Sequence, residues 1–211
     1  MTVQSTAGSH EVASGVSRRP RGRPRRVIDE TELLDAVERV LRTGGMEAVS
    51  IERIAAEVGV SRATLYRSVS SKEELLSRVF LRMTDKLTMD VLIAAAADGR
   101  SAQERLNAMI RLHVDAAITM RGYVFVLFGR EWLTPQVYEH WRRWTRRYEQ
   151  IWADVIRSAA DEGALTVKDP ATATRLVIGM LMWVSRWYRP SLVTAEDLAD
   201  EAIRLLGGNP S

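Results

Sequence analysis

Residues 50–76 read SIERIAAEVGVSRATLYRSVSSKEELL and predict two short helices joined by a tight turn, followed directly by a third helix. Ser50 is placed as the N-cap of the first helix, whose apolar residues recur at helical spacing. Gly59 stands where a left-handed residue ends that helix, because glycine carries no Cβ. Ser61 then caps a second helix with a mostly small or polar exterior. This order is typical of a helix-turn-helix, whose second helix enters the major groove of DNA.

The same segment supplies side chains suited to base edges and phosphates. The candidate DNA-binding residues are Ser50, Ser61, Arg62, Ala63, Thr64, Tyr66, Arg67 and Lys72. Residues 62–64 are expected near base edges, whereas Ser50, Tyr66 and Lys72 are expected to contact phosphates. Lys72 falls in the first turn of the third helix, where a cation opposes the helix macrodipole. We interpret this placement as a sign that an anion outside the protein compensates the ammonium group.

A second basic element precedes the helices. Six arginines crowd into residues 18–26 with no acidic residue among them, although the net charge of the whole chain is only +3. Arg21 and Arg23 belong to an Arg-Gly-Arg-Pro segment, which can lie extended in a narrow A·T-rich minor groove. The alternative is a disordered basic tail that only aids solubility.

The rest of the chain predicts helices only. Residues suited to N-caps precede the apolar helical runs: Asp29, Ser70 or Ser71, Ser101, Asp169 before Pro170, and Thr194. The helix that opens near residue 70 is expected to run towards Met89. We therefore expect an all-α fold of about nine helices, with an N-terminal three-helix helix-turn-helix domain joined to a C-terminal helical bundle for effector binding and dimerisation. The expected division is a disordered basic arm at 1–26, a DNA-binding domain at 27–75 and a ligand-binding and dimerisation domain at 76–211.

Composition argues against several other classes of protein. The chain has no cysteine, which excludes disulfides and thiolate metal sites and favours a reducing cytoplasm. No run of about 18 or more apolar residues is present, so we expect no membrane span. His113 beside Asp115 is interpreted as structural rather than as a metal pair, and we expect no metal and no cofactor. Because neither a nucleophile elbow nor a phosphate loop is found, no catalytic residue is assigned and we expect no enzyme.

Three motifs, IAAEVGVS at 54–61, TLY at 64–66 and SKEELL at 71–76, resemble the TetR family of bacterial transcriptional regulators. Ser68 and Val69 stand where that family often has His-Phe, which removes one phosphate contact and some packing volume. The segment WVSRWYRP at 183–190 resembles a subgroup of TetR regulators that control fatty-acid and steroid catabolism. This resemblance implies an acyl-CoA effector whose binding releases the DNA.

The predicted helix over residues 169–188 is apolar nearly all the way round. Leu176, Met180, Trp183 and Trp187 form one apolar line, and a second line runs beside it. Such a helix must be covered on more than one side, by its own core and most simply by a second copy of the chain. A homodimer would place two recognition helices about 34–36 Å apart and would read a palindromic operator.

An aromatic stripe at Trp141, Trp144, Tyr148 and Trp152 lies upstream, interleaved with arginines. A stripe at this spacing is usually core. The alternative makes Trp144, Tyr148 and Trp183 the walls of an apolar ligand cavity between helices. In that case Arg186, or Arg146 or Arg189, would meet a phosphate or carboxylate at its mouth.

These features favour a dimeric, ligand-responsive repressor that binds double-stranded operator DNA and is released by a small hydrophobic or acyl-CoA-like effector. The helix that opens near residue 70 would carry the signal between the two regions. The alternative is an architectural DNA-binding protein without a small-molecule effector. It predicts sequence-indifferent binding with steep salt dependence and a filled effector core.

Overall fold

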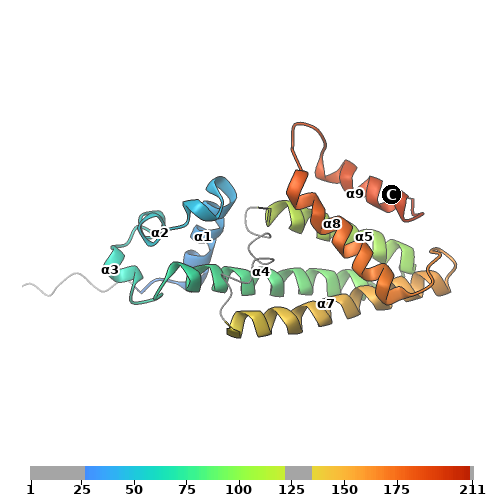
Figure 1. The fold of residues 1–211 in the computed structure, drawn as a ribbon, viewed down its shortest axis with the longest axis horizontal. Helices are drawn as coiled ribbons and strands as arrows, with labels where there is room; N and C mark the ends of the chain where they lie inside the picture. The colour runs from blue at the N-terminus through green and yellow to red at the C-terminus, as the bar shows by residue number, and fades with distance from the viewer. Residues whose placement is uncertain (1–26, 122–134, 210–211) are drawn as a thin grey trace, which may run out of the picture.

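The computed structural model describes residues 27–121 and 135–209, and every regular element in these ranges is helical. The elements are α1 (Glu30–Gly44), η1 (Met46–Ala48, a 3-10 helix), α2 (Ile51–Val58), α3 (Arg62–Leu65), α4 (Lys72–Ala95), α5 (Ala102–Thr119), α7 (Pro135–Asp161), α8 (Pro170–Trp187) and α9 (Ala195–Leu205) (Figure 1). The all-α prediction is confirmed. The predicted arm, with Arg21 and Arg23, lies outside the described residues. Within the described ranges, no helix has the length and apolar character needed to cross a membrane.

The predicted N-caps account for where the helices begin. The side chains that accept a backbone N–H of the first turn are Asp29, Ser50, Ser61, Ser71, Ser101, Asp169 and Thr194. Of the two candidates before α4, Ser71 is the cap, while Ser70 donates to the Glu74 carboxylate through both its N–H and its hydroxyl. At Ser101 the cap is reciprocal, because the Glu104 carboxylate accepts the Ser101 N–H in return.

Helix α4 is longer than the sequence predicted. It was expected to run towards Met89 and continues to Ala95. Val91 and Ala94 are buried in the helical bundle, and alanine is the strongest helix former, so tertiary packing and local propensity both extend the helix.

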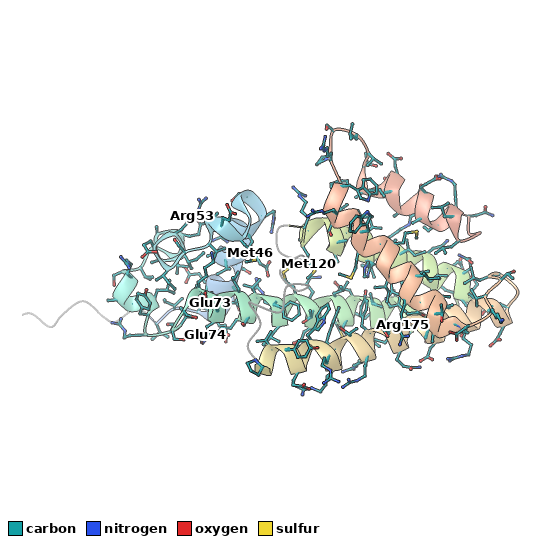
Figure 2. All side chains as sticks on the ribbon, viewed as in Figure 1. Met46, Arg53, Glu73, Glu74, Met120 and Arg175 are labelled. Atoms are coloured by element: carbon teal, nitrogen blue, oxygen red, sulfur yellow. The ribbon has the colours of Figure 1, made fainter. Side chains whose placement is uncertain are left out.

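Two hydrophobic cores share α4. Leu75 and Val79, near its beginning, pack in the first core with α1, α2 and α3. Leu87 and Val91, further along, pack in the second core with α5, α7, α8 and α9. Figure 1 shows α1–α3 at one end of the molecule and α5 and α7–α9 at the other, and Figure 2 shows side chains filling both regions. Helix α4 therefore packs in both cores, and Met120 at the end of α5 also belongs to the first core.

Candidate nucleic-acid interface and ligand cavity

The turn between α2 and α3 is built by Gly59 and Ser61. Gly59 has φ 70° and ψ 37°, the left-handed conformation predicted for the end of α2. The N–H of Val60 donates to the carbonyl oxygen of Ala55 at 2.9 Å, and Ser61 Oγ accepts the N–H of Thr64 at 3.1 Å. Leu65 is fully buried in the first core and anchors α3. One apolar contact thus fixes the helix and leaves its other faces to solvent.

The outer surface of α3 is open. Arg62, Ala63, Tyr66 and Arg67 are exposed, with Tyr66 at 49%, and Thr64 is half-buried. In Figure 1, α3 lies at the end of the molecule away from α8 and α9. The structure therefore brings the predicted recognition residues together on one accessible surface, which is what insertion into a major groove requires.

Arg62 of α3 and Arg67, just after it, have side-chain partners within the protein. Arg62 pairs with Glu52 of α2 at 2.6 Å, and Arg67 donates to Thr64 Oγ1 at 3.1 Å. Arg62 and Glu52 are both more than half exposed, so their attraction is weak and strongly screened. The Glu52 carboxylate therefore holds the Arg62 guanidinium only weakly.

Lys72 corrects one sequence interpretation. Its ammonium group donates to the carbonyl oxygen of Met46 at 2.7 Å, across the short connection between α1 and α2. A backbone carbonyl of the protein thus compensates the charge near the N-terminus of α4, and an outside anion is not needed to explain it. Ser50 and Ser61 use their hydroxyl oxygens as helix caps, and Ser61 Oγ is also hydrogen-bonded to Thr64 Oγ1 at 2.9 Å.

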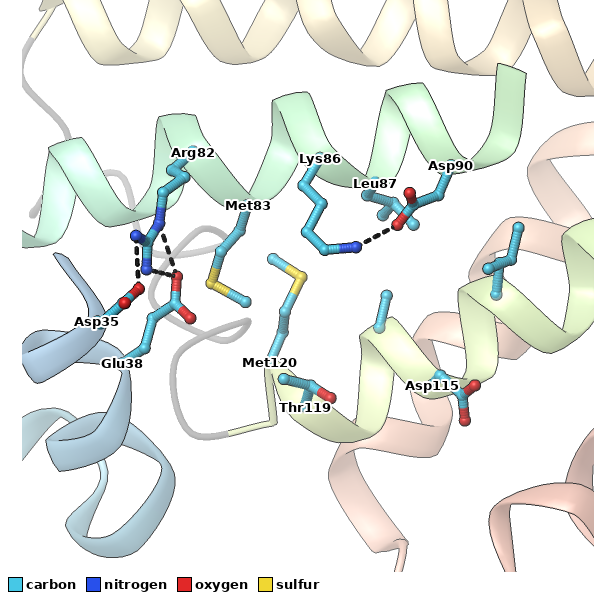
Figure 3. Close-up of a pocket in the computed structure, with 12 residues that line it drawn as sticks. Asp35, Glu38, Arg82, Met83, Lys86, Leu87, Asp90, Asp115, Thr119 and Met120 are labelled. Atoms are coloured by element: carbon cyan, nitrogen blue, oxygen red, sulfur yellow. Dashed lines mark hydrogen bonds and ion pairs between the residues drawn. The ribbon is translucent and has the colours of Figure 1, made fainter. Parts of the chain in front are cut away.

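Ion pairs of Arg82 join α4 to α1. Arg82 of α4 reaches across to α1, where it bonds to Glu38 and donates to Asp35 Oδ1 at 2.8 Å (Figure 3). Lys86 pairs with Asp90 one turn further along α4. Beside them Met83 and Met120 border a hollow of about 570 Å³ between α1, α4 and α5. Arg82 thus ties the orientation of α1 to that of α4.

A second hollow, named the effector cavity after the ligand site that the sequence predicts there, lies between α5, α7 and α8 and has a volume of about 560 Å³. Its lining residues are His113, Trp141, Trp144, Thr145, Tyr148, Glu149, Arg175, Ile178, Gly179, Met182 and Trp183. Three of the four predicted ligand-binding residues, Trp144, Tyr148 and Trp183, are among them. A Cβ added at Gly179 would meet open space, so this glycine leaves room on the α8 side.

Arg186 does not line the effector cavity, and Arg175 does. Arg175 Nε lies 3.3 Å from Glu149 Oε2 of α7. Sequence reasoning passed over Arg175, although Arg175, Gly179 and Trp183 recur every four residues and therefore share a face of α8.

The aromatic stripe of α7 lies partly in the second core and partly at the effector cavity. Trp152 is fully buried and belongs to the second core. Towards the start of α7 the rings become a cavity wall, where Trp144 stacks on Trp141 with centroids 5.0 Å apart and on Tyr148 at 4.9 Å. Core and cavity thus share one helix face.

Trp144 also joins this wall to α4. Its indole Nε1 donates to Thr88 Oγ1 at 2.7 Å and lies 3.1 Å from the carbonyl oxygen of Thr84. Both acceptors are buried residues of α4. Trp144 therefore joins the wall of the effector cavity to α4, which also packs in the first core.

His113 is part of the cavity rather than only of the core. Its Nδ1 lies 2.8 Å from the hydroxyl of Tyr148, and Asp115 is exposed elsewhere on α5. Burial lowers the pKa of His113 to about 4 and raises the pKa of Tyr148. Both groups are therefore neutral at pH 7. Within the described parts of the chain, no group of three or more metal-ligating side chains is present.

We expect acid to destabilise the fold through His113. Since its folded pKa is about 4 and the ordinary value is 6.5, the unfolded chain takes up the proton first, and stability falls as pH decreases from 6.5 towards 4. The loss at pH 5 is about 2 kcal/mol. Urea unfolding of the wild type and of His113→Leu at pH 7 and pH 5 measures this loss. Between these pH values the free energy of unfolding of the variant should fall by about 2 kcal/mol less than that of the wild type. The same pH dependence in both proteins would contradict a buried neutral imidazole.

An accessible recognition helix on one core, joined by one long helix to a bundle with an aromatic cavity, defines a helix-turn-helix DNA-binding protein with a separate helical C-terminal region. Residues 33–79 match the family described as bacterial regulatory proteins, tetR family, and residues 99–208 match the family described as tetracyclin repressor-like, C-terminal domain. The chain belongs to the TetR family of DNA-binding transcriptional regulators.

Similar proteins agree with this assignment. An uncharacterized HTH-type transcriptional regulator of Mycobacterium tuberculosis strain H37Rv is 32% identical over 111 residues, which cover 52% of this chain and 47% of that protein. The match thus spans about half the length of this relative. A TetR/AcrR family regulator from Thermobifida fusca YX-ER1 superposes with a TM-score of 0.71 and 25% identity, over 83% of this chain and 94% of that one. AibR, solved in complex with isovaleryl coenzyme A and operator DNA, has a TM-score of 0.70 and 23% identity, over 84% and 97% of the two chains.

Proposed function

We propose that this protein is a dimeric cytoplasmic repressor that binds a palindromic operator through α3 of each protomer and releases it when an acyl-CoA enters the effector cavity. The observation that carries the proposal is the hydrogen bonding of Trp144, a cavity wall, to Thr84 and Thr88 of α4. That contact gives the ligand a physical route to the recognition helix, because α4 packs in both cores.

Residues 27–75 form the DNA-binding domain in this proposal, and residues 76–211 bind the ligand and the second protomer. The direct DNA contacts are those predicted from the sequence, with Arg62, Ala63 and Thr64 near base edges and Tyr66 at phosphates. The arm at 1–26 remains a prediction, in which Arg21 and Arg23 lie in the adjacent minor groove.

An apolar surface on α8 and α9, the α8–α9 face, supports dimerisation. Its exposed side chains include Leu176, Trp183, Trp187 and Leu205. On α8, Val177 and Leu181 are buried, whereas Leu176 is 70% and Trp183 is 60% exposed. Leu205 of α9 is 69% exposed and lines the same apolar groove as Trp183. Exposure of such apolar surface to water is unfavourable. A symmetric second copy of the chain covers it on both protomers at once.

The effector cavity supports a hydrophobic ligand with an anionic end. Its aromatic walls suit an acyl chain, and Arg175 with Glu149 lies among the lining residues as a polar contact point. AibR, whose fold is similar, binds isovaleryl coenzyme A. The architectural alternative predicted a filled effector core, and a cavity of about 560 Å³ argues against it.

Selection of bound DNA from a pool of random duplexes tests the DNA half of the proposal. We expect enrichment of an inverted repeat whose half-sites lie about one helical turn, roughly 34–36 Å, apart. Enrichment of no sequence, with affinity set only by salt, would instead support an architectural protein.

We expect Trp144→Phe to weaken the coupling between ligand and DNA. Phenylalanine retains an aromatic wall but loses both hydrogen bonds to α4. Residues on such a route change coupling by about 0.5–2 kcal/mol, or roughly 2–30-fold in the ligand's effect on operator affinity. Fluorescence anisotropy with a labelled operator, with and without isovaleryl coenzyme A, measures this effect. Trp141→Phe is the matched control, because it makes the same substitution at a neighbouring residue of the same wall. An equal loss of ligand–DNA coupling in both variants would contradict the route through Trp144.

A further inference from the structure

We propose that His113 and Tyr148 form a neutral hydrogen-bonding subsite for a carbonyl oxygen, so that the cavity takes an acyl thioester and rejects the free carboxylate of the same chain. This inference rests on the proposed function, because it takes the space between α5, α7 and α8 as the effector site. Beyond the proposed function, it identifies the ligand atom that is recognised, the carbonyl oxygen, and the two side chains that bind it.

The pair is built from two helices at the cavity surface. His113 comes from α5 and Tyr148 from α7, and both line the cavity. The 2.8 Å separation of Nδ1 and the phenol oxygen is a normal hydrogen bond. Trp141, Trp144, Ile178, Met182 and Trp183 supply apolar lining, with Trp144 stacked on the ring of Tyr148. A polar pair in such surroundings fixes the orientation of an otherwise apolar ligand.

The pair retains a proton to donate in either tautomer of His113. If the Tyr148 hydroxyl donates to Nδ1, the imidazole carries its proton on Nε2. If Nδ1 donates to the phenol oxygen, the Tyr148 hydroxyl hydrogen is left over. Both cases leave one neutral donor, and a carbonyl oxygen is its natural acceptor.

The charge of the site favours a neutral ligand group at this point. Burial keeps His113 uncharged at pH 7. Among the described lining residues the remaining cation is Arg175, which already pairs with Glu149. A carboxylate beside the His113–Tyr148 pair would be desolvated without a cationic partner, which is strongly unfavourable. A thioester carbonyl carries no charge and avoids this penalty.

Thr145 is the competing donor. It lies one turn before Tyr148 on α7 and lines the same cavity, and its hydroxyl oxygen is buried without a partner among the described residues. The experiment must therefore distinguish the Thr145 hydroxyl from the His113–Tyr148 pair.

Calorimetric titration with three probes tests the inference: isovaleryl coenzyme A, its thioether analogue with a methylene in place of the carbonyl, and isovalerate. The wild type should bind the thioester more tightly than the thioether by roughly 5–100-fold, the effect of leaving a buried donor unpaired. Isovalerate should show no detectable binding at concentrations where the thioester saturates.

The double variant His113→Leu/Tyr148→Phe should bind thioester and thioether alike. Replacing both partners with apolar groups of similar shape leaves no orphaned donor and is nearly neutral for folding. Thr145→Val should keep the preference for the thioester, and loss of the preference in Thr145→Val alone would overturn the assignment.

Infrared spectroscopy of a ¹³C-carbonyl thioester on the wild type supplies a readout that needs no variant. The carbonyl frequency is expected below that of the same thioester in an apolar solvent, and a frequency equal to the apolar-solvent value would contradict the hydrogen bond.

The outcomes separate this inference from the proposed function. Equal affinity of the wild type for thioester and thioether overturns the carbonyl subsite and leaves ligand-induced DNA release intact. A clear thioester preference without any effect on operator affinity supports the subsite and overturns the proposed release mechanism. Absence of binding by both coenzyme A compounds overturns both.

Discussion

Arg62→Ala is expected to weaken operator binding by at least about 30-fold. A good bidentate contact to a base contributes roughly 1–3 kcal/mol, and a symmetric dimer loses that contact at both half-sites. Arg62 is exposed on α3, and its partner Glu52 is an exposed side chain that DNA can displace. Tyr66→Ala, at a proposed phosphate contact, should weaken binding to all sequences more evenly. Anisotropy titrations with the selected operator at fixed salt concentration measure both effects.

The matched control is Arg157→Ala. Arg157 is also an exposed arginine in an ion pair with an acidic residue, but it lies on α7, in the bundle. Its removal should leave operator affinity unchanged. Unfolding free energies of all three variants should stay within about 0.5 kcal/mol of the wild type, because these are exposed side chains. Unchanged operator affinity in both Arg62→Ala and Tyr66→Ala would show that α3 is not the recognition helix.

The double variant Trp187→Glu/Leu205→Glu is expected to be monomeric and to lose operator affinity by at least about 100-fold. Trp187 is 47% and Leu205 is 69% exposed in the single chain, and both line the groove of the α8–α9 face. A carboxylate at each position is tolerated by the monomer, but in the proposed dimer it would be buried without a partner. Loss of the second recognition helix removes the avidity of bivalent binding, which reaches about 10²–10⁴-fold.

Analytical ultracentrifugation measures the first effect and anisotropy the second. Ile93→Glu is the control, because Ile93 is 66% exposed on α4 and lies outside the groove. It should leave both dimer mass and operator affinity unchanged. A double variant that stays dimeric would place the interface elsewhere.

Much of the fold was predictable because its signals are local. Ser61 caps α3 and Gly59 ends α2 through atoms a few residues away, so the identity of the residue nearly determines the conformation. Apolar spacing likewise predicted two apolar lines on α8, of which the line with Leu176 and Trp183 is exposed in the single chain. The accessible surface of α3 followed from the same pattern, since a short helix with one large apolar residue has only one face to bury.

The features that escaped prediction join residues distant in the chain. Lys72 bonds to Met46, 26 residues earlier, and His113 to Tyr148, 35 residues later. Periodicity assigns a side chain to a helix face but does not say which helix covers that face or where a cavity ends. For that reason the sequence suggested Arg186, Arg146 or Arg189 as the anion contact and not Arg175, which the packing of α8 against α7 places at the cavity.

Operator affinity of the wild-type protein with and without saturating isovaleryl coenzyme A tests the central claim most directly. The account predicts a drop of about 5–150-fold on ligand addition, the usual range of coupling between two sites, with ligand binding shown in parallel by calorimetry. An operator affinity that stays the same while the ligand is demonstrably bound would contradict the claim that the effector cavity controls α3.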